Sequence, residues 1–549
     1  MKRYIIMACA CSGLGVIPGA YAQQNSNDST LNRTMVVENQ FNPEVMDASK
    51  INVLPRMEEP AVEKKLIDYA TTTHLVTGWE DVAMKPMARE WKQGKTPRGY
   101  FRAGYGTKGN LDVKGSYLWD ISEKDRLKVM ASSYGLNGSM PSYYGEKDWN
   151  ARFYRTDASL DYKHKFNAVS LGVGGSFASQ VFNYMCDENY TGYNRQHYTL
   201  GEGYIGMSSL NEDLPLQFSV QTGFRLFDRK YDFPVLEKGG ENIVHTLGNV
   251  WGNLNNDQKV GIAFSMDNLM YDAAAFKDYT LLKLNPYYTL QSDDYKIRLG
   301  ANVDWQTANG SGVNISPDVS LEYIFSDSYV LYLNAEGGTR LNDFRTLNNV
   351  SPYWNQNEQL RSSYTPVDAK LGLKASPVSN LSFELFGGYR ITKNELFSMP
   401  FEDRGYYYTN LLQEKTKVGY GGLSIAYGYK DWFDFGLKGV YYSWNCEEGN
   451  DASLLLKPQF TLDFHARAKV FEGLYINAGY QYEGRKDLTK EGLGKTDPVN
   501  NLYVGAEYLL FNRLTVFARC NNLLNKEYVT ESGYPSQLFH AAAGVSIRF

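Results

Sequence analysis

The chain has few of the residues that build disulfide frameworks and metal sites. Its 549 residues include only 5 cysteines and 6 histidines. Cys186, Cys446 and Cys520 lie far apart in the sequence, so their spacing predicts neither a disulfide framework nor a zinc site. The histidines form no His-x-x-x-His or His-Glu-x-x-His arrangement. We therefore expect no bound metal and no cofactor.

The chain also lacks a strong excess of one charge and a long apolar run. Its 56 basic and 61 acidic residues give a net charge of −5, without the basic excess of a general nucleic-acid-binding protein. No stretch reaches the ~18 consecutive apolar residues that a transmembrane helix needs. The mean hydropathy of −0.44 still allows a membrane barrel, because lipid-facing and lumen-facing residues alternate along barrel strands.

Enzyme motifs are absent or stand in the wrong context. No Gly-x-Ser-x-Gly nucleophile elbow occurs. Gly104, Gly106 and Gly109 match the Gly-x-Gly-x-x-Gly pattern, which needs a following helix to hold a pyrophosphate. Leu111 and Val113 instead alternate with polar residues and predict a strand. We expect no catalytic residue and no enzymatic activity.

Tyrosine and glycine are abundant, whereas proline is scarce. The chain has 43 tyrosines, 50 glycines and 18 prolines, and aromatic residues make up 14% of it. This composition is typical of barrels that consist of many short strands with aromatic girdles. It is the first indication that the chain spans a membrane with strands.

The first residues have the pattern of a secretory signal. Lys2 and Arg3 precede a short apolar run from Ile5 to Ile17, and Ala20-Tyr21-Ala22 fits the cleavage rule. Residues 1–22 are therefore predicted to be a signal peptide. An alternative is a lipoprotein signal ending at Cys9, for which the apolar run would be very short.

The mature chain divides into two parts. Residues 23–97 alternate only weakly and are predicted to be a periplasmic region. Residues 98–549 show apolar and polar residues in strict alternation, for example over 295–305. Since side chains of a strand point to opposite faces with a period of 2, each strand here has an apolar and a polar face.

Connection lengths distinguish a barrel from a soluble sandwich. We count about 22 strands, joined alternately by short turns and longer connections. An outer-membrane barrel has short periplasmic turns and long extracellular loops, and an even strand count returns both termini to the periplasm. The predicted fold is all-β, a transmembrane antiparallel up-and-down barrel over 98–549. The predicted short turns include 163–164, and the predicted long connections include 339–363, 392–415 and 521–539.

Polar residues on the strands are predicted to face the lumen. They mix both charges, so they imply no simple ion selectivity. An acid–histidine–base set within them resembles a catalytic arrangement but is also what a wet barrel wall contains. The lumen-facing set comprises Arg225, Lys296, Arg298, Asp304, Asp463, His465, Arg467 and Glu483.

The last residues carry a resemblance to a known family. Asn522–Tyr528, Gly533-Tyr534-Pro535, Gly544-Val545 and Phe549 resemble the C-terminal end of TonB-dependent receptors. The family's usual Gly-Arg after Gly-Tyr-Pro is missing, since Gln537-Leu538 stand there. A terminal Phe549 is similar to the insertion signal that the barrel assembly machinery reads. The resemblance implies a Gram-negative outer-membrane barrel of 22 strands.

The chain departs from that family at its N-terminal end. Family members carry a globular plug, and residues 23–97 are too few for a complete one. Thr34, Met35, Val36 and Val37 resemble the box that contacts a TonB-type energy coupler. Alternatively, this segment forms an edge strand or docks onto a periplasmic partner. The chain therefore resembles a plugless relative of the receptors.

The expected function is passage or import of a bulky nutrient through the outer membrane. A gate is then needed, and residues 23–97, the long connections or a surface lipoprotein could supply one. The alternative is a scaffold barrel that docks periplasmic or surface partners. Tyrosine-rich connections, such as Tyr353-Trp354 and Tyr406–Tyr408, are predicted either to bind a partner or to fold over the mouth.

Overall fold

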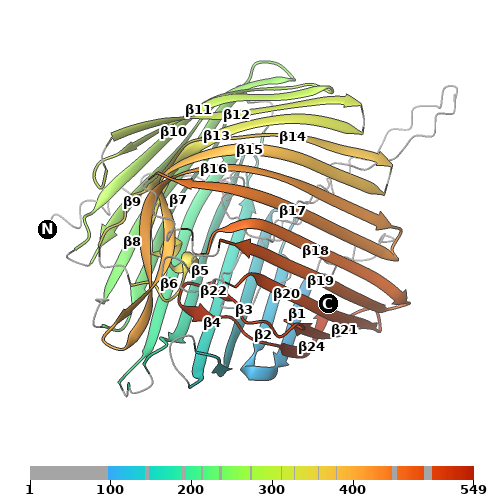
Figure 1. The fold of residues 1–549 in the computed structure, drawn as a ribbon. Helices are drawn as coiled ribbons and strands as arrows, with labels where there is room; N and C mark the ends of the chain where they lie inside the picture. Colours follow the sequence, from blue (N-terminus) through green and yellow to red (C-terminus); the bar gives the residue numbers. More distant parts are fainter. Residues whose placement is uncertain are drawn as a thin grey trace.

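A closed 22-stranded antiparallel barrel forms the described part of the protein. In Figure 1 the strands follow one another around the barrel, and the last strands lie beside the first. This confirms the predicted fold class. The computed structural model describes residues 97–549 except 143–146, 188–189, 191, 212–213, 234–237, 273–274, 311, 327, 356–357, 379, 448–453, 455 and 487–496.

Each wall strand pairs with its neighbours in sequence, and β24 closes the ring against β1. The wall strands are β1 (Gly99–Gly106), β2 (Leu111–Asp120), β3 (Asp125–Met140), β4 (Trp149–Lys165), β5 (Val169–Asn183), β6 (Arg195–Ser209), β7 (Gln217–Arg229), β8 (Gly239–Asn253), β9 (Gln258–Tyr271), β10 (Tyr279–Gln291), β11 (Tyr295–Gln306), β12 (Gly312–Ser326), β13 (Tyr329–Arg340), β14 (Ser363–Val378), β15 (Leu381–Asp403), β16 (Tyr406–Tyr429), β17 (Phe433–Cys446), β18 (Pro458–Phe471), β19 (Leu474–Arg485), β20 (Val499–Leu510), β21 (Leu514–Asn521) and β24 (His540–Arg548).

The remaining elements lie in connections. They are a 3-10 turn η2 (Thr107–Gly109), a short helix α2 (Phe344–Val350) and a small hairpin of β22 (Val529–Glu531) and β23 (Tyr534–Pro535). Within the described residues, no helix has the length and apolar character to cross a membrane.

The first and last residues of the barrel domain, Gly99 and Phe549, pair with each other where the ring closes. The Gly99 amide donates to the Phe549 carbonyl at 2.7 Å, and the Phe549 amide donates to the Gly99 carbonyl at 3.0 Å. The Phe549 ring lies over Gly99, where a Cβ atom would come within 2.3 Å of it, and stacks on Tyr117 at 6.0 Å. A side chain at position 99 would require this ring to shift.

The outer face of the wall is apolar. Leu160 on β4, Phe177 on β5 and Leu299 on β11 are 49%, 52% and 48% exposed. A soluble protein rarely exposes apolar side chains in such numbers, whereas a barrel in lipid has to. The outward apolar face and the closed ring together define an integral outer-membrane barrel.

Two predicted connections are wrong. Residues 163–164 belong to β4, which continues to Lys165, because His164 and Tyr162 both bind Asp125 across the sheet. Residues 392–415 are no loop, because β15 and β16 continue as one hairpin to a turn at Arg404-Gly405. The aromatic and polar residues of that segment concealed its strand pattern.

We expect Leu299→Arg to destabilise the barrel. Leu299 lies on the outer face, five residues beyond the end of the 292–294 turn, and a charge there would have to be solvated within lipid. The expected loss is ~2–4 kcal/mol of unfolding free energy in lipid vesicles, if this position lies near the midplane. Leu299→Ala is the control for loss of the side chain alone, and equal unfolding midpoints for the two variants would contradict the assignment.

We expect Phe549→Asn to lower the amount of folded barrel in the outer membrane, because the variant lacks the ring that lies over Gly99 and the proposed insertion signal. The measurement is the heat-modifiable, folded fraction of the protein in membranes. Phe511→Asn is the matched control, since Phe511 lies in a turn and is 89% exposed. Equal folded fractions for both variants would remove the special role of Phe549.

Candidate functional site: an aromatic cap across the barrel mouth

Three connections fold together at the end of the barrel that carries the long connections. By the general pattern of outer-membrane barrels, this end is extracellular and the end with the short turns is periplasmic. The hairpin of β15 and β16 extends beyond the wall after a register shift between Thr392 and Glu395. Asn394 has a φ of 55° there, the left-handed conformation that asparagine adopts more readily than most residues.

The tip of this hairpin reaches the opposite side of the barrel. Cys186, just after β5, pairs with Tyr406 of β16 in an isolated antiparallel bridge. Strands β5 and β16 are half the ring apart, so this bridge joins connections that start on opposite sides of the barrel. In Figure 1 the hairpin bends from the wall toward the green strands.

Main-chain hydrogen bonds fix the crossing. The Asp187 amide donates to the Gly405 carbonyl at 2.8 Å, and the Tyr407 amide donates to the Met185 carbonyl at 3.0 Å. These bonds flank Cys186 and Tyr406, which are therefore a non-hydrogen-bonded pair with closely spaced Cα atoms. A main-chain clasp thus joins opposite sides of the mouth.

The connection 341–362 folds inward with helix α2. Asp343 caps the helix by accepting from the Thr346 amide at 2.9 Å. The Phe344 amide donates to the Glu241 carboxylate of β8 at 3.0 Å. Arg345 binds Glu202 of β6 at 3.1 Å. These contacts attach the helix to the inner wall.

The last connection supplies a third element. Tyr534 of β23 stacks on Tyr353 with ring centroids 3.5 Å apart and an interplanar angle of 10°. Its hydroxyl donates to the Tyr407 carbonyl on the crossing hairpin. The Thr409 hydroxyl donates to the Ser532 carbonyl at 2.9 Å and the Thr409 amide to the Tyr353 carbonyl at 2.9 Å. Three connections therefore meet at one point.

We call the buried aromatic cluster at this point the aromatic cap. Most of its ring pairs are tilted or edge-to-face, arrangements that each add ~0.5–1.5 kcal/mol beyond burial. Arg229 lies 4.9 Å from the ring centres of both Phe344 and Trp354. The cap consists of Trp149, Phe153, Phe182, Tyr184, Tyr198, Phe227, Phe344, Tyr353, Trp354, Tyr406, Tyr408 and Tyr534.

One carboxyl group lies buried within the cap region. Glu531 is 1% exposed, and neither of its oxygens makes a hydrogen bond of normal geometry to a described residue. Burial raises the pKa of Glu531 to about 8, and the neighbouring Ser351 hydroxyl opposes this only in part. The carboxyl group therefore keeps its proton to a higher pH than a solvent-exposed glutamate does.

The predicted lumen-facing residues lie on the wall and do not form one site. Arg298 binds Asp318 at 2.8 Å, Arg225 binds Glu202 at 3.4 Å, and Lys296 binds Glu322 at 3.9 Å. Each of these pairs joins neighbouring strands.

The other predicted residues also lie on the wall, but their partners are two strands away or in the same strand. Asp304 accepts from the Thr339 amide at 2.6 Å, Arg467 binds Glu507 at 3.8 Å, and Glu483 binds Arg485 at 3.1 Å. Asp463 is opposite Lys438, and His465 is opposite Gly436, in the register of β17 and β18. Thr34, Met35, Val36 and Val37 lie outside the described residues. Among the described residues, no group of three or more His, Cys, Asp or Glu side chains is placed to hold a metal ion.

The sequence predicted the connection residues of the cap but not its wall residues. The aromatic runs 353–354 and 406–408 were predicted to bind a partner or to fold over the mouth, and Tyr353, Trp354, Tyr406 and Tyr408 fold into it, at most 4% exposed. The wall residues of the cap carried no separate signal, because Phe153 or Phe182 looks like any apolar strand residue.

Comparison with known proteins identifies the fold but no relative by sequence. No family model and no curated protein matches the chain. Solved structures do match, and the chain has the fold of TonB-dependent receptors. One is the FrpB iron transporter from Neisseria meningitidis, with a TM-score of 0.64, 11% identity, and coverage of 83% of this chain and 82% of that one.

Two further structures agree. The ferric-catecholate import receptor Fiu from E. coli has a TM-score of 0.60 and 12% identity over 83% of each chain. The ferripyoverdine receptor of the outer membrane of Pseudomonas aeruginosa has a TM-score of 0.60 and 12% identity over 84% of this chain and 72% of that one. At these identities the likeness establishes the barrel fold, and the receptor-like resemblance of the C-terminal residues agrees with it.

The buried Glu531 makes the cap sensitive to pH. Folding raises its pKa from 4.5 to about 8, so the closed cap binds the proton more tightly than an opened one. We expect the cap to lose stability as pH rises from ~4.5 to about 8 and to change little above that.

Hydrogen exchange of the β22–β23 amides, corrected for intrinsic rates, measures this stability. Protection should fall with rising pH in the native protein and become independent of pH in Glu531→Gln. Glu527→Gln, an exposed carboxyl of the same connection, is the control. A Glu531→Gln profile that matches the native profile would show that another group titrates.

Proposed function

We propose that the protein is a receptor and transporter that passes a bulky nutrient through the outer membrane, with the aromatic cap as its gate. The observation that carries this proposal is the crossing hairpin, which joins opposite walls through non-covalent contacts alone. The solved structures of the same fold include an iron transporter and an import receptor. These names support transport as the class of function and leave the nutrient open.

The construction of the cap favours a gate over a permanent seal. Connections that meet through their surfaces can separate without breaking the hydrogen-bonded wall, since local opening usually involves connecting segments. A buried carboxyl group and several buried hydroxyls without a hydrogen-bond partner among the described residues, such as those of Ser532 and Ser536, reduce the stability of the closed state. A cap that served only to close the mouth would gain stability from apolar residues there.

The width of the barrel sets the class of cargo. A 22-stranded ring encloses more space than the 8-stranded barrels whose interiors are filled by side chains. Within the proposal, the wall pairs such as Arg298–Asp318 form a polar lining of mixed charge for a bulky, polar cargo.

Energy for opening has two candidate sources. Thr34, Met35, Val36 and Val37 would contact a TonB-type coupler, as their resemblance to the family's box implies. A surface lipoprotein that contacts the exposed side of the cap is the other. The barrel assembly machinery and outer-membrane lipids are the partners expected of any such barrel.

A reversible lock tests whether the cap must open. Tyr406→Cys places a thiol opposite the native Cys186 at the separation that suits a disulfide. With Cys446→Ser and Cys520→Ser removing the other thiols, oxidation should fasten the hairpin to the opposite wall. We expect cells with the locked barrel to lose fitness like a deletion strain in at least one nutrient limitation, and a reducing agent to restore it.

The same background with Cys186→Ser and Tyr406→Cys is the matched control, because it loses the tyrosine but cannot form the bridge. A locked barrel that supports growth as well as the control in every limitation where the deletion strain fails would contradict transport. That outcome would favour the scaffold function, which needs the barrel in place but not its opening.

A further inference from the structure

The periplasmic end of the barrel carries a group of cations on the inner face of the strands beside the seam. Two of them are well exposed, since the side chains of Arg98 and Arg126 are 53% and 43% accessible. We call this group the basic rim, and it extends from the start of β21, past the seam, to the end of β4. It consists of Arg98, Arg126, Lys128, Lys163, Arg513 and Arg548.

The basic rim faces the lumen. Lys163 lies ten residues after Phe153, which belongs to the inner cluster, and side chains of a strand alternate with a period of 2. Arg126 is opposite Lys163 in the register of β3 and β4 and therefore shares its face. Phe101, 42% exposed, marks the outer face of β1, so Arg98, three residues earlier, points inward.

Two cations of the rim stand directly opposite each other. Arg126 is in register with Lys163 on one side and with Asp120 on the other. Asp120 accepts from Arg126 at 2.9 Å and lies 3.7 Å from Arg98, so two arginines share one carboxylate. Like charges in directly opposite positions destabilise a sheet. The wall therefore has more positive charge here than its own carboxylates neutralise.

The described residues supply one further inner-face carboxylate at this place. Asp161 of β4 lies near Lys163 and accepts a hydrogen bond from the Tyr204 hydroxyl. The rim thus has six cations for two inner-face carboxylates. Within the part of the chain that the structure describes, four of the six are in no ion pair, namely Lys128, Lys163, Arg513 and Arg548.

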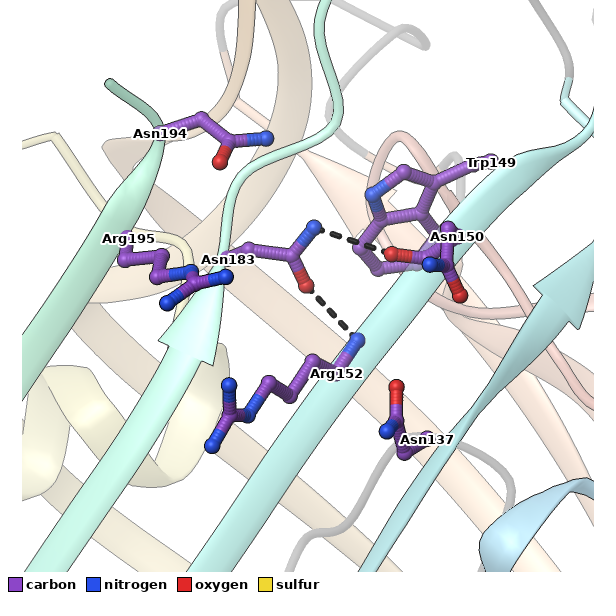
Figure 2. A pocket seen from close by; sticks show the side chains of 7 residues that line it. All are labelled: Asn137, Trp149, Asn150, Arg152, Asn183, Asn194 and Arg195. Atoms are coloured by element: carbon purple, nitrogen blue, oxygen red, sulfur yellow. Dashed lines mark hydrogen bonds between the residues drawn. The ribbon is translucent and has the colours of Figure 1, made fainter.

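The excess of cations is local to the rim. Elsewhere at the periplasmic end, Lys469 pairs with Asp431 at 2.9 Å and with Glu472 at 3.0 Å. Near the other end of β4, Arg152 is opposite the neutral Asn137, and in Figure 2 asparagine side chains lie around it. Opposed like charges are therefore no general property of these strands.

The spread of the rim suits an extended acidic chain better than a small anion. Six strands with a spacing of ~4.8 Å extend over roughly 24 Å, and a phosphate or carboxylate ion would contact only part of that length. The cations also point into the opening, where a chain segment fits more readily than the surface of a folded protein. Charge and shape together indicate a segment with an excess of carboxylates.

The chain itself has such a segment before the rim. Residues 36–63 contain six acidic and two basic residues. Residues 64–97 join them to Arg98, and these 34 residues can span at most ~115 Å, far more than the rim requires. A covalent tether gives the segment a high effective concentration at the rim, which a separate partner lacks.

We propose that residues 36–63 dock across the basic rim and supply the missing carboxylates. Glu58, Glu59 and Glu63 stand within six residues and form the densest acidic stretch of the segment. The contact fixes the region before the barrel at the periplasmic opening, beside the seam. This docking is independent of transport and would hold for the scaffold function as well.

Cleavage by an arginine-specific protease tests the docking. The full mature protein in lipid nanodiscs has one site inside the segment, after Arg56, and another outside it, after Arg33. We expect cleavage after Arg56 to be at least about tenfold faster in Arg126→Glu/Lys163→Glu, because repulsion replaces two charge-assisted contacts. Cleavage after Arg33 should not change, and high salt should accelerate cleavage after Arg56 in the native protein.

Lys259→Glu/Lys430→Glu is the matched control, since it makes the same charge change at the periplasmic ends of other strands. Glu58→Lys/Glu59→Lys alone should also accelerate cleavage, whereas its combination with the rim variant should restore the slow rate. Equal cleavage after Arg56 in the native protein and in the rim variant would overturn the proposal. If the rim variant does not fold, Arg126→Gln/Lys163→Gln replaces it, with a smaller acceleration expected.

Carbodiimide cross-linking identifies the occupant, because it joins a lysine to a carboxylate in contact with it. We expect peptide mass spectrometry to find links from Lys128 or Lys163 to Glu58, Glu59 or Glu63 of the same chain. Links in intact outer membranes from these lysines to another periplasmic protein, and none to residues 36–63, would assign the rim to a separate partner and overturn the proposal.

Discussion

The need to hydrogen-bond every backbone amide and carbonyl within lipid governs the whole structure. A hydrocarbon layer offers no partner for these groups, so a sheet that crosses it has to close on itself. Strand β24 therefore pairs with β1, and Gly99 and Phe549 exchange hydrogen bonds at the seam. The ring then requires apolar side chains outside, as at Leu299, and sets how wide the mouth must be.

A ring of this width has an entrance that its own wall residues cannot fill. Strands β15 and β16 continue over this entrance, and two other connections fold against them. The resulting aromatic cap holds its parts by stacking, as between Tyr353 and Tyr534, and by short runs of main-chain hydrogen bonds. Such contacts hold the three connections together, whereas the wall strands are hydrogen-bonded to each other along their length.

The inner and outer faces of β4 and β5 differ at the extracellular ends of these strands. On β4 and β5, Phe153 and Phe182 point inward and build the cap, whereas Arg152 and Asn183 point to the outer face. The alternation that separates lipid from lumen in the membrane continues above it and separates the aromatic cap from the outer surface. Gln537 stands where the receptor family usually has a Gly-Arg pair. Its side-chain amide forms two hydrogen bonds with the side-chain amide of the buried Asn110, which gives this departure from the family pattern a structural reason.

The sequence by itself determined the barrel, its strand number and most of its turns, because alternation and loop length are local properties that lipid makes strict. It did not reveal that 392–415 is a crossing hairpin, or that Tyr353 and Tyr534 stack, because these contacts join residues far apart in the chain. Wall residues of the cap such as Phe182 have the same local pattern as any apolar strand residue. Only the closed ring, which places β5 opposite β16, decided which of them meet.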